Sequence, residues 1–536
     1  MKSFKWLPLW LLLATMTAHA QKISGSYYSL TQFYNDDSLM HFKAPESGLR
    51  SMQYLDLHLL SADWEAGFNA EYYLPEALLG YNPELKGYFL GWYVQYQKDN
   101  WKLRAGNIYD QFGSGMVFRS WNDKQLGIDN ALRGIDVQYK WGSGPAVKLI
   151  AGQPRTGMTY DDSFIGGISV KNEFELGLDA SLNVEASAVT RYYEPENDKV
   201  PAHVNLYGIQ TQFSGGPWDF YFEYDYKTPD ALYANGVLND RVLFDGDAYT
   251  FNAGYARKGF GVNLTLRRAE NIQMYSRRSL EFNPYNTGVV NYVPALVKQH
   301  DYPLATLYVY ATRPGISWAD MHVGEIGGQA DMVFKIKRKT FLGGRYGTVV
   351  SVNASQWHAL KAEFIPALGI YKRNFWEGGA LYYRDINVEI KRKLNKKLKT
   401  GLFVMHQNYN QLLLEGHGEM INALTVVSDW YYRLPHYSSL RFEAEHLWTK
   451  QDEKNWAEAG LEFNYNGTWG FFVNDMYNYG SSKIHYYNAG VVYTHGGNRL
   501  QLSYGRQKGG LVCVGGVCRY VPPSKGLQLS LSLSLL

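Results

Sequence analysis

Hydrophobic and polar residues alternate with a period of two along most of this chain. The clearest segment lies near its end, where one face is leucine and the other is glutamine and serine: Leu527, Leu529, Leu531, Leu533 and Leu535 against Gln528, Ser530, Ser532 and Ser534. An earlier segment places Tyr88, Leu90, Trp92, Val94 and Tyr96 on one side. A period of two is typical of β-strands with two chemically different faces. The pattern predicts an all-β protein.

The chemistry of the two faces indicates strands that cross a membrane. In the stretch 439–448, Arg441, Glu443 and Glu445 share one face, and aromatic Phe442 and Trp448 lie on the other. A soluble β-sandwich would not place charged faces opposite aromatic ones so often. In lipid every backbone group must be paired, so strands survive there only in a closed barrel. We therefore expect a transmembrane barrel, with Arg441, Glu443 and Glu445 as charges of a polar lumen.

The connections between these strands alternate between short and long. The tight turns are rich in Gly, Asn and Asp: 61–63, 98–100, 142–144, 215–217, 257–259, 466–468 and 496–498. The long polar segments are 35–48, 75–86, 113–131, 228–246, 271–318 and 508–523. Short periplasmic turns with long extracellular loops are the outer-membrane pattern. Counting gives about 24 antiparallel strands, within 22–26 because strand boundaries are the weakest part of such assignments.

The first 20 residues have the pattern of a secretory signal peptide. Lys2 and Lys5 precede the apolar run 6–16, and Ala18-His19-Ala20 matches a small-x-small cleavage site. A membrane anchor would need roughly 20 apolar residues, and this run is shorter. We expect residues 1–20 to be removed and residues 21–536 to form a single outer-membrane barrel domain.

Composition narrows the class of protein further. The chain carries 53 Lys and Arg against 50 Asp and Glu, and this balance argues against a nucleic-acid partner. Aromatic residues make up 16% of the chain, although its mean hydropathy is only −0.34. Barrels combine these properties because lumen-facing and lipid-facing residues alternate. The expected partners are outer-membrane lipid and protein subunits of an outer-membrane complex.

Four stretches carry a resemblance to a known family. They are 106–115 (Gly-Asn-Ile-Tyr-Asp-Gln-Phe-Gly-Ser-Gly), 126–134 (Leu-Gly-Ile-Asp-Asn-Ala-Leu-Arg-Gly), 374–379 (Asn-Phe-Trp-Glu-Gly-Gly) and the tail 513–536. Together they resemble a Bacteroidota outer-membrane β-barrel family catalogued as a domain of unknown function. The resemblance covers essentially the whole mature chain. It implies a large barrel in the outer membrane of a Gram-negative cell and supplies no catalytic residues.

Candidate chemistry is sparse. Cys513 and Cys518 are the only cysteines, and in an oxidising compartment such a pair predicts a disulfide. The chain has neither a Gly-x-Ser-x-Gly elbow nor a His-Glu-x-x-His pair, so we assign no catalytic residues and do not expect an enzyme. His417 is interpreted as a solvated loop histidine, and Asp245 with Asp247 lacks the spacing of a calcium loop. No cofactor or metal ligand is assigned.

Two loops stand out by length and aromatic content, namely 113–131 and 271–318. Loops longer than about 15 residues are usually functional or disordered, and aromatic residues argue against disorder. These loops fold either inward as a constriction or outward as a docking surface. Three functions stay open: a channel or porin for small polar solutes, a structural or accessory barrel of an assembly, secretion or uptake complex, and, least favoured, an outer-membrane enzyme.

Overall fold

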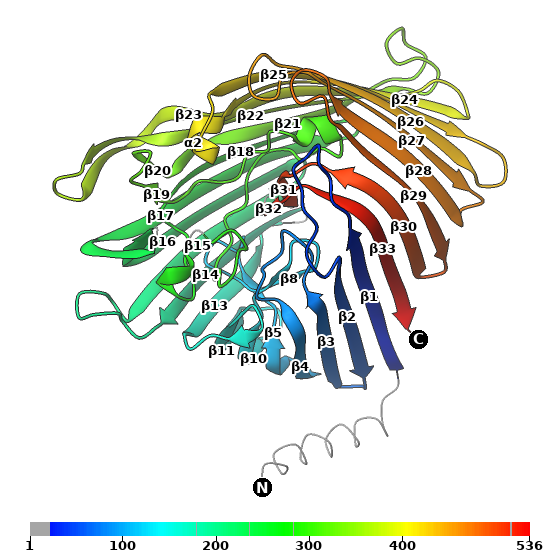
Figure 1. Ribbon diagram of the computed structural model, residues 1–536. Helices are drawn as coiled ribbons and strands as arrows, with labels where there is room; N and C mark the ends of the chain where they lie inside the picture. Colours follow the sequence, from blue (N-terminus) through cyan, green and yellow to red (C-terminus); the bar gives the residue numbers. More distant parts are fainter. Residues whose placement is uncertain (1–21, 178, 235, 282, 515–516, 536) are drawn as a thin grey trace.

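A closed antiparallel barrel of 24 strands makes up most of the molecule (Figure 1). The computed structural model describes residues 22–177, 179–234, 236–281, 283–514 and 517–535. The expected signal peptide, residues 1–20, lies outside this range. Strands that follow one another along the chain pair with each other around the barrel. Strand β1 pairs with β33 and closes the barrel, with Tyr28 opposite Ser532. The expected fold class and strand number are confirmed.

The barrel strands range from 8 to 24 residues in length. In chain order they are β1 (Lys22–Tyr34), β2 (Leu49–Leu60), β3 (Trp64–Glu76), β4 (Lys86–Lys98), β5 (Trp101–Ile108), β10 (Leu132–Lys140), β11 (Ala146–Thr156), β13 (Phe164–Glu175), β14 (Ala180–Tyr192), β15 (His203–Gly215), β16 (Trp218–Ala234), β17 (Val237–Arg257), β18 (Phe260–Glu270), β21 (Glu325–Ile336), β22 (Thr348–Ile365), β23 (Ile370–Lys393), β24 (Leu398–Asn410), β25 (Met420–Arg433), β26 (Ser439–Trp448), β27 (Trp456–Tyr465), β28 (Trp469–Asn478), β29 (His485–His495), β30 (Asn498–Gln507) and β33 (Ser524–Leu535).

Short elements occupy the long connections. They are β6 (Gln111–Phe112), β7 (Phe118–Arg119), β8 (Asn122–Asp123), β9 (Ile128–Asp129), β12 (Thr159–Tyr160), η1 (Arg278–Leu280), η2 (Pro303–Thr306), β19 (Ile316–Ser317), β20 (His322–Val323), α2 (Gln411–Glu415), β31 (Gly510–Val514) and β32 (Val517–Val521). Among the described residues no helix is long and apolar enough to cross a bilayer.

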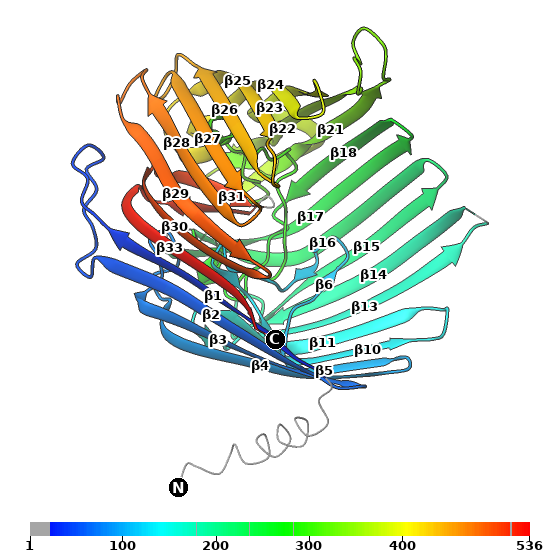
Figure 2. The ribbon, with the colours of Figure 1, turned by 90° about the vertical axis from the view of Figure 1, so that its right-hand side faces the viewer.

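Tryptophan and tyrosine pair across neighbouring strands beside several of the short turns. The ring centroids lie 4.8 Å apart for Trp64 and Tyr96, 4.5 Å for Trp101 and Tyr139, 4.6 Å for Trp218 and Tyr255, and 4.8 Å for Trp469 and Tyr493. The four tryptophans are exposed on the outer wall. Amphipathic rings of this kind concentrate where lipid headgroups meet water. The pairs therefore mark a membrane interface, and the short turns beside them identify it as the periplasmic one. Strand β1 begins and β33 ends at this interface (Figure 2).

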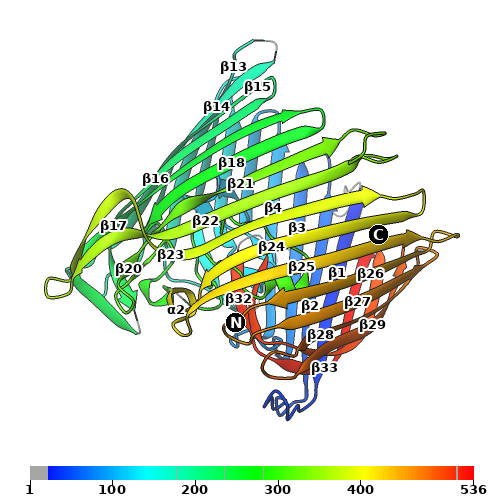
Figure 3. The ribbon, with the colours of Figure 1, turned by 90° about the horizontal axis from the view of Figure 1, so that it is seen from above.

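One long segment expected as a loop is instead a hairpin. Residues 228–246 continue β16 and β17 beyond the wall, where Asp230 pairs with Phe244 and Tyr233 pairs with Leu238. The adjacent β22 and β23 form a similar long hairpin on the same side of the molecule (Figure 3). Phe244 stacks on Tyr371 of that neighbour, with ring centroids 5.6 Å apart. The two hairpins pack against each other. Residues 228–246 therefore form strands, although their polar composition had predicted a loop.

Candidate functional site: a lumen filled by loops

A single long connection, residues 271–324 between β18 and β21, enters the lumen and is called here the plug loop. Its first half pairs with the loop 109–131, which follows β5 into the same space (Figure 1). The Arg119 amide donates to the Val290 carbonyl at 3.0 Å, and the Tyr292 amide donates to the Gly115 carbonyl at 2.8 Å. The buried Asn291 amide group also donates to the Met116 carbonyl at 2.6 Å. Backbone and side-chain hydrogen bonds thus join the two loops.

An apolar core seals this junction against one wall of the barrel. From the two loops it contains Phe112, Met116, Val117, Phe118, Ile272, Met274, Val290 and Val293, and from the wall Ile150, Ile165, Val189, Val204 and Leu206 among others. Burial of this area excludes water from the contact and stabilises the inward arrangement. The lumen at this level is therefore packed like a protein interior.

The second half of the plug loop crosses to the opposite wall. There Leu304, Tyr308 and Tyr310 join a second apolar core with residues of β22 to β27. The Trp357 indole donates to the Leu296 carbonyl at 3.1 Å, and the Gln407 amide group donates to the Tyr308 carbonyl at 2.7 Å. Contacts with both walls show that the loops 113–131 and 271–318 fold inward, which decides between the two arrangements expected for them.

The plug loop holds several titratable groups with shifted pKa values, among them His300 and Glu281. Burial lowers the pKa of His300 to about 4, and Lys298 lowers it further. The His300 ring packs on Phe403 with centroids 4.6 Å apart. Burial also raises the pKa of Glu281 to about 7, against the opposing effect of the Tyr233 amide that donates to its carboxylate at 2.8 Å. His300 is therefore neutral near physiological pH, whereas Glu281 is only partly ionised there.

Polar cavities remain between the two inward loops and the periplasmic turns. One has a volume of about 600 Å³ and is lined by Asp301 and Pro303 of the plug loop, by Arg441 and Glu458 of the wall, and by the turn residue Thr468. Another, of about 540 Å³, is lined by four lysines on the other side of the barrel: Lys102, Lys140, Lys148 and Lys171. These cavities give the lumen a polar space at its periplasmic end.

The charges predicted to face the lumen lie beside the first of these cavities. Arg441 forms ion pairs with Asp429 at 2.9 Å, Glu443 at 2.5 Å and Glu462 at 3.2 Å. Phe442, between these charges on the strand, is exposed on the outer wall. Glu445 lies deeper and accepts a hydrogen bond from the Leu304 amide of the plug loop at 2.8 Å.

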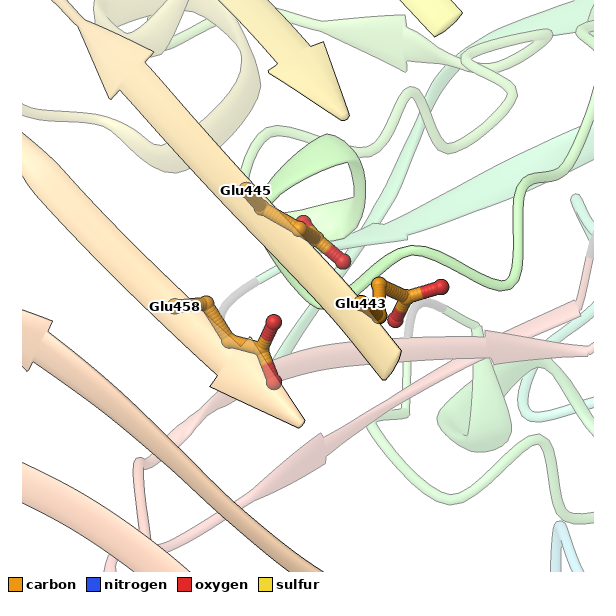
Figure 4. Close-up of side chains that lie close together, drawn as sticks. All are labelled: Glu443, Glu445 and Glu458. Atoms are coloured by element: carbon orange, nitrogen blue, oxygen red, sulfur yellow. The ribbon is translucent and has the colours of Figure 1, made fainter. Parts of the chain in front are cut away.

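A third carboxylate completes an acidic cluster with Glu443 and Glu445. Figure 4 shows Glu458, on the neighbouring strand β27, on the same side of the sheet as the two β26 residues. All three residues are buried, and one carboxylate oxygen from each lies within 4.8 Å of the other two. Sequence reasoning missed Glu458. Its signal was the pairing of Glu445 with Glu458 between the neighbouring strands β26 and β27.

The remaining candidates are dispersed. Cys513 and Cys518 form a disulfide in the β31–β32 hairpin, and the Asn286 amide group of the plug loop donates to the Cys518 carbonyl at 3.0 Å. His417 is exposed and lies 3.3 Å from Glu415. Asp247 forms an ion pair with the buried Arg268. The hairpin therefore contacts the plug loop, and the Asp247 carboxylate is already paired with an arginine.

A closed barrel with an apolar outer wall, an aromatic girdle and a charged lumen defines an outer-membrane β-barrel protein, which places the chain in the outer membrane. Within that class, the chain belongs to the Family of unknown function (DUF6029), whose sequence profile matches residues 1–535. A comparison with curated proteins found no match.

Solved structures of similar topology include three barrels from Pseudomonas aeruginosa. A mutant of the ferric enterobactin receptor has 9% identity and a TM-score of 0.45, with 96% of this chain and 81% of that chain covered. The siderophore receptor PirA has 8% identity and a TM-score of 0.41, with the same coverage. OccK1 has 8% identity and a TM-score of 0.36, with 96% and 99% covered.

Proposed function

We propose that this barrel is a channel for small polar solutes whose lumen is narrowed by the plug loop. The observation that carries the proposal is the charged cavity of about 600 Å³ between the plug loop and the periplasmic turns. Carboxylates and two arginines line this cavity, and mixed charges on a pore wall select polar solutes over apolar ones. The barrel would admit solutes rather than catalyse a reaction.

The lumen of so wide a barrel is too large for strand side chains alone to fill. The plug loop must then set the conductance, and its displacement would open the path. We propose that the arrangement described above is the closed or low-conductance form. The family resemblance also leads us to propose a bacterium of the Bacteroidota as the host.

The test compares the intact barrel with a variant in which residues 283–312 are replaced by a short Gly-Ser linker. Both are purified in detergent and reconstituted into planar bilayers and into sugar-loaded liposomes. We expect low conductance from the intact barrel and at least a tenfold larger conductance from the variant, with matching rates of liposome swelling. A variant that is correctly inserted but equally impermeable would overturn the channel proposal.

A second candidate is an accessory barrel of an outer-membrane complex. It is favoured by the two apolar cores, because a densely packed plug suits a permanent seal better than a gate. Purification in mild detergent distinguishes the two functions. A stoichiometric protein partner together with an impermeable plug-deleted variant would support the accessory function.

A further inference from the structure

Two carboxylates of the acidic cluster have no positive partner. Arg441 is already shared by Asp429, Glu443 and Glu462, and within the described part of the chain no ion pair reaches Glu445 or Glu458. Glu445 is 4% exposed and Glu458 is 5% exposed. The Oε1 atom of Glu445 and the Oε2 atom of Glu458 are buried without a hydrogen-bond partner. Each carboxylate therefore presents an unpaired oxygen inside the protein.

Buried charge of this kind requires compensation. A buried carboxylate without a partner is strongly unfavourable, so it either takes up a proton or binds a cation. Here three carboxylates converge, and one oxygen of Glu445 is held in place by the Leu304 amide. The ion pair with Arg441 similarly orients Glu443. Carboxylate oxygens that are held in place therefore lie beside carboxylate oxygens without a partner, and this arrangement favours binding of a cation over protonation.

The donor set indicates which cation fits. All the donors are carboxylate oxygens, which suit hard cations rather than zinc or copper. Calcium accepts several carboxylates in irregular geometry and completes its shell with water, whereas magnesium is usually held by only one or two carboxylates. Glu443 and Glu458 also line the cavity of about 600 Å³, which provides access and space for water ligands.

We propose that Glu443, Glu445 and Glu458 bind a calcium ion that ties the plug loop at Leu304 to the barrel wall. The cation neutralises Glu445 and Glu458, and Glu445 in turn holds the plug-loop backbone through the Leu304 amide. The site stands whether or not the barrel conducts solutes, because it is defined by binding and stability.

The first experiment measures binding to the full barrel in detergent. After removal of metal with EGTA, terbium is added as a luminescent calcium analogue, with Trp456, two residues from Glu458 and buried, as the sensitiser. We expect emission that calcium displaces and that the double variant Glu445→Gln, Glu458→Gln weakens at least tenfold. The matched control is Glu462→Gln, which removes a carboxylate from the same strand and cavity outside the cluster. Equal calcium-displaceable emission from wild type and double variant would overturn the proposal.

The second experiment separates calcium binding from protonation and from misfolding. Calcium should raise the Tm of the wild type, measured by loss of heat-modifiable mobility, and should leave the Tm of the double variant unchanged. In EGTA the double variant should be at least as stable as the wild type, because it no longer buries two unpaired charges. A wild-type Tm that does not respond to calcium would show that protons neutralise the cluster and would sink the cation site.

Discussion

The side chains that face the lumen could be predicted one strand at a time. Alternation places Arg441, Glu443 and Glu445 opposite Phe442 because a strand turns successive side chains to opposite faces. To predict that Glu458 lies beside Glu445, the register between β26 and β27 must also be known. Register depends on the length of the connecting turn and on packing, so a single strand does not contain it. The cluster emerges only when both strands are placed.

The assignment of the leucine face to lipid predicts how single charges in β33 are tolerated. Leu531 pairs with the outward-facing Leu500, and Ser530 pairs with Gln501 on the lumen side. Leu531→Arg should destabilise the barrel by roughly 2–4 kcal/mol near the bilayer midplane, whereas Ser530→Arg should cost far less because water hydrates the charge. Urea titration in lipid vesicles measures both changes. Equal costs at the two positions would contradict the assignment.

The half-buried imidazole of His300 predicts that packing of the plug loop against the barrel wall depends on pH. Its pKa is lowered to about 4 in the fold, and an unfolded histidine titrates near 6.5. The fold binds the proton less well, so His300 contributes stability above about pH 6.5 that is lost as the pH falls toward 4. The charged groups that act on it are Lys298, Asp301, Asp331 and Glu389.

The test is a comparison of Tm values between pH 7.5 and 4.5. Acidification should lower the Tm of the wild type more than that of His300→Phe, which keeps an aromatic ring against Phe403 without a titratable group. His417→Phe is the control, because His417 is exposed in a loop away from the apolar core. A pH response that is the same in all three proteins would show that His300 is not the group responsible.

Among the elements, the short turns and the positions of most long connections were predictable, but the structure that each long connection adopts was not. Turns such as 98–100 and 466–468 combine Asn, Asp and Gly, whose left-handed backbone the hairpin geometry needs: φ is 50° at Asp99 and 52° at Asn466. The long segments were ambiguous because polar composition fits both a loop and a solvated hairpin. Residues 228–246 became a hairpin through the contact of Phe244 with Tyr371, which lies over a hundred residues further on.

One of the buried side chains that join the two inward loops is Asn291. Its amide group donates to the carbonyls of Met116 at 2.6 Å and Ile272 at 3.0 Å, and its oxygen accepts from the Met274 amide at 2.8 Å. Asn291→Ala leaves three backbone groups without partners, at a cost of about 1–3 kcal/mol for each buried group. We expect a barrel that still inserts but has a loosened plug loop.

Loosening is measured by protease cleavage within 271–324 on the detergent-purified barrel and by single-channel recordings. Cleavage should accelerate and conducting events should become more frequent for Asn291→Ala. The matched control is Asn286→Ala, which removes one hydrogen bond to the β31–β32 hairpin outside the joint. If both variants resist protease as the wild type does, Asn291 is not the residue that holds the two loops together.

On the scale of the whole molecule, the barrel can be predicted from local sequence patterns, whereas the path of the plug loop cannot. Period-two alternation is repeated in every strand, so strand number and closure follow from counting. The path of the plug loop depends on contacts far apart in sequence, such as Trp357 with Leu296 and Gln407 with Tyr308. The aromatic content of this long loop predicted that it is ordered, and only the fold shows that it is turned inward.

The orientation of the whole barrel gives the last prediction. The short turns place their end of the barrel in the periplasm, so the segment 35–48 is extracellular and the connection 337–347 is periplasmic. Leu39 and Phe341 are 60% and 95% exposed, so a cysteine or a short epitope at either position should not disturb the core.

On intact cells, a membrane-impermeant maleimide should label Leu39→Cys and should label Phe341→Cys only after the outer membrane is permeabilised. The two native cysteines are joined in a disulfide and do not react, so an unsubstituted barrel provides the background. Labelling of Phe341→Cys but not Leu39→Cys on intact cells would invert the barrel and would place the plug loop on the periplasmic side.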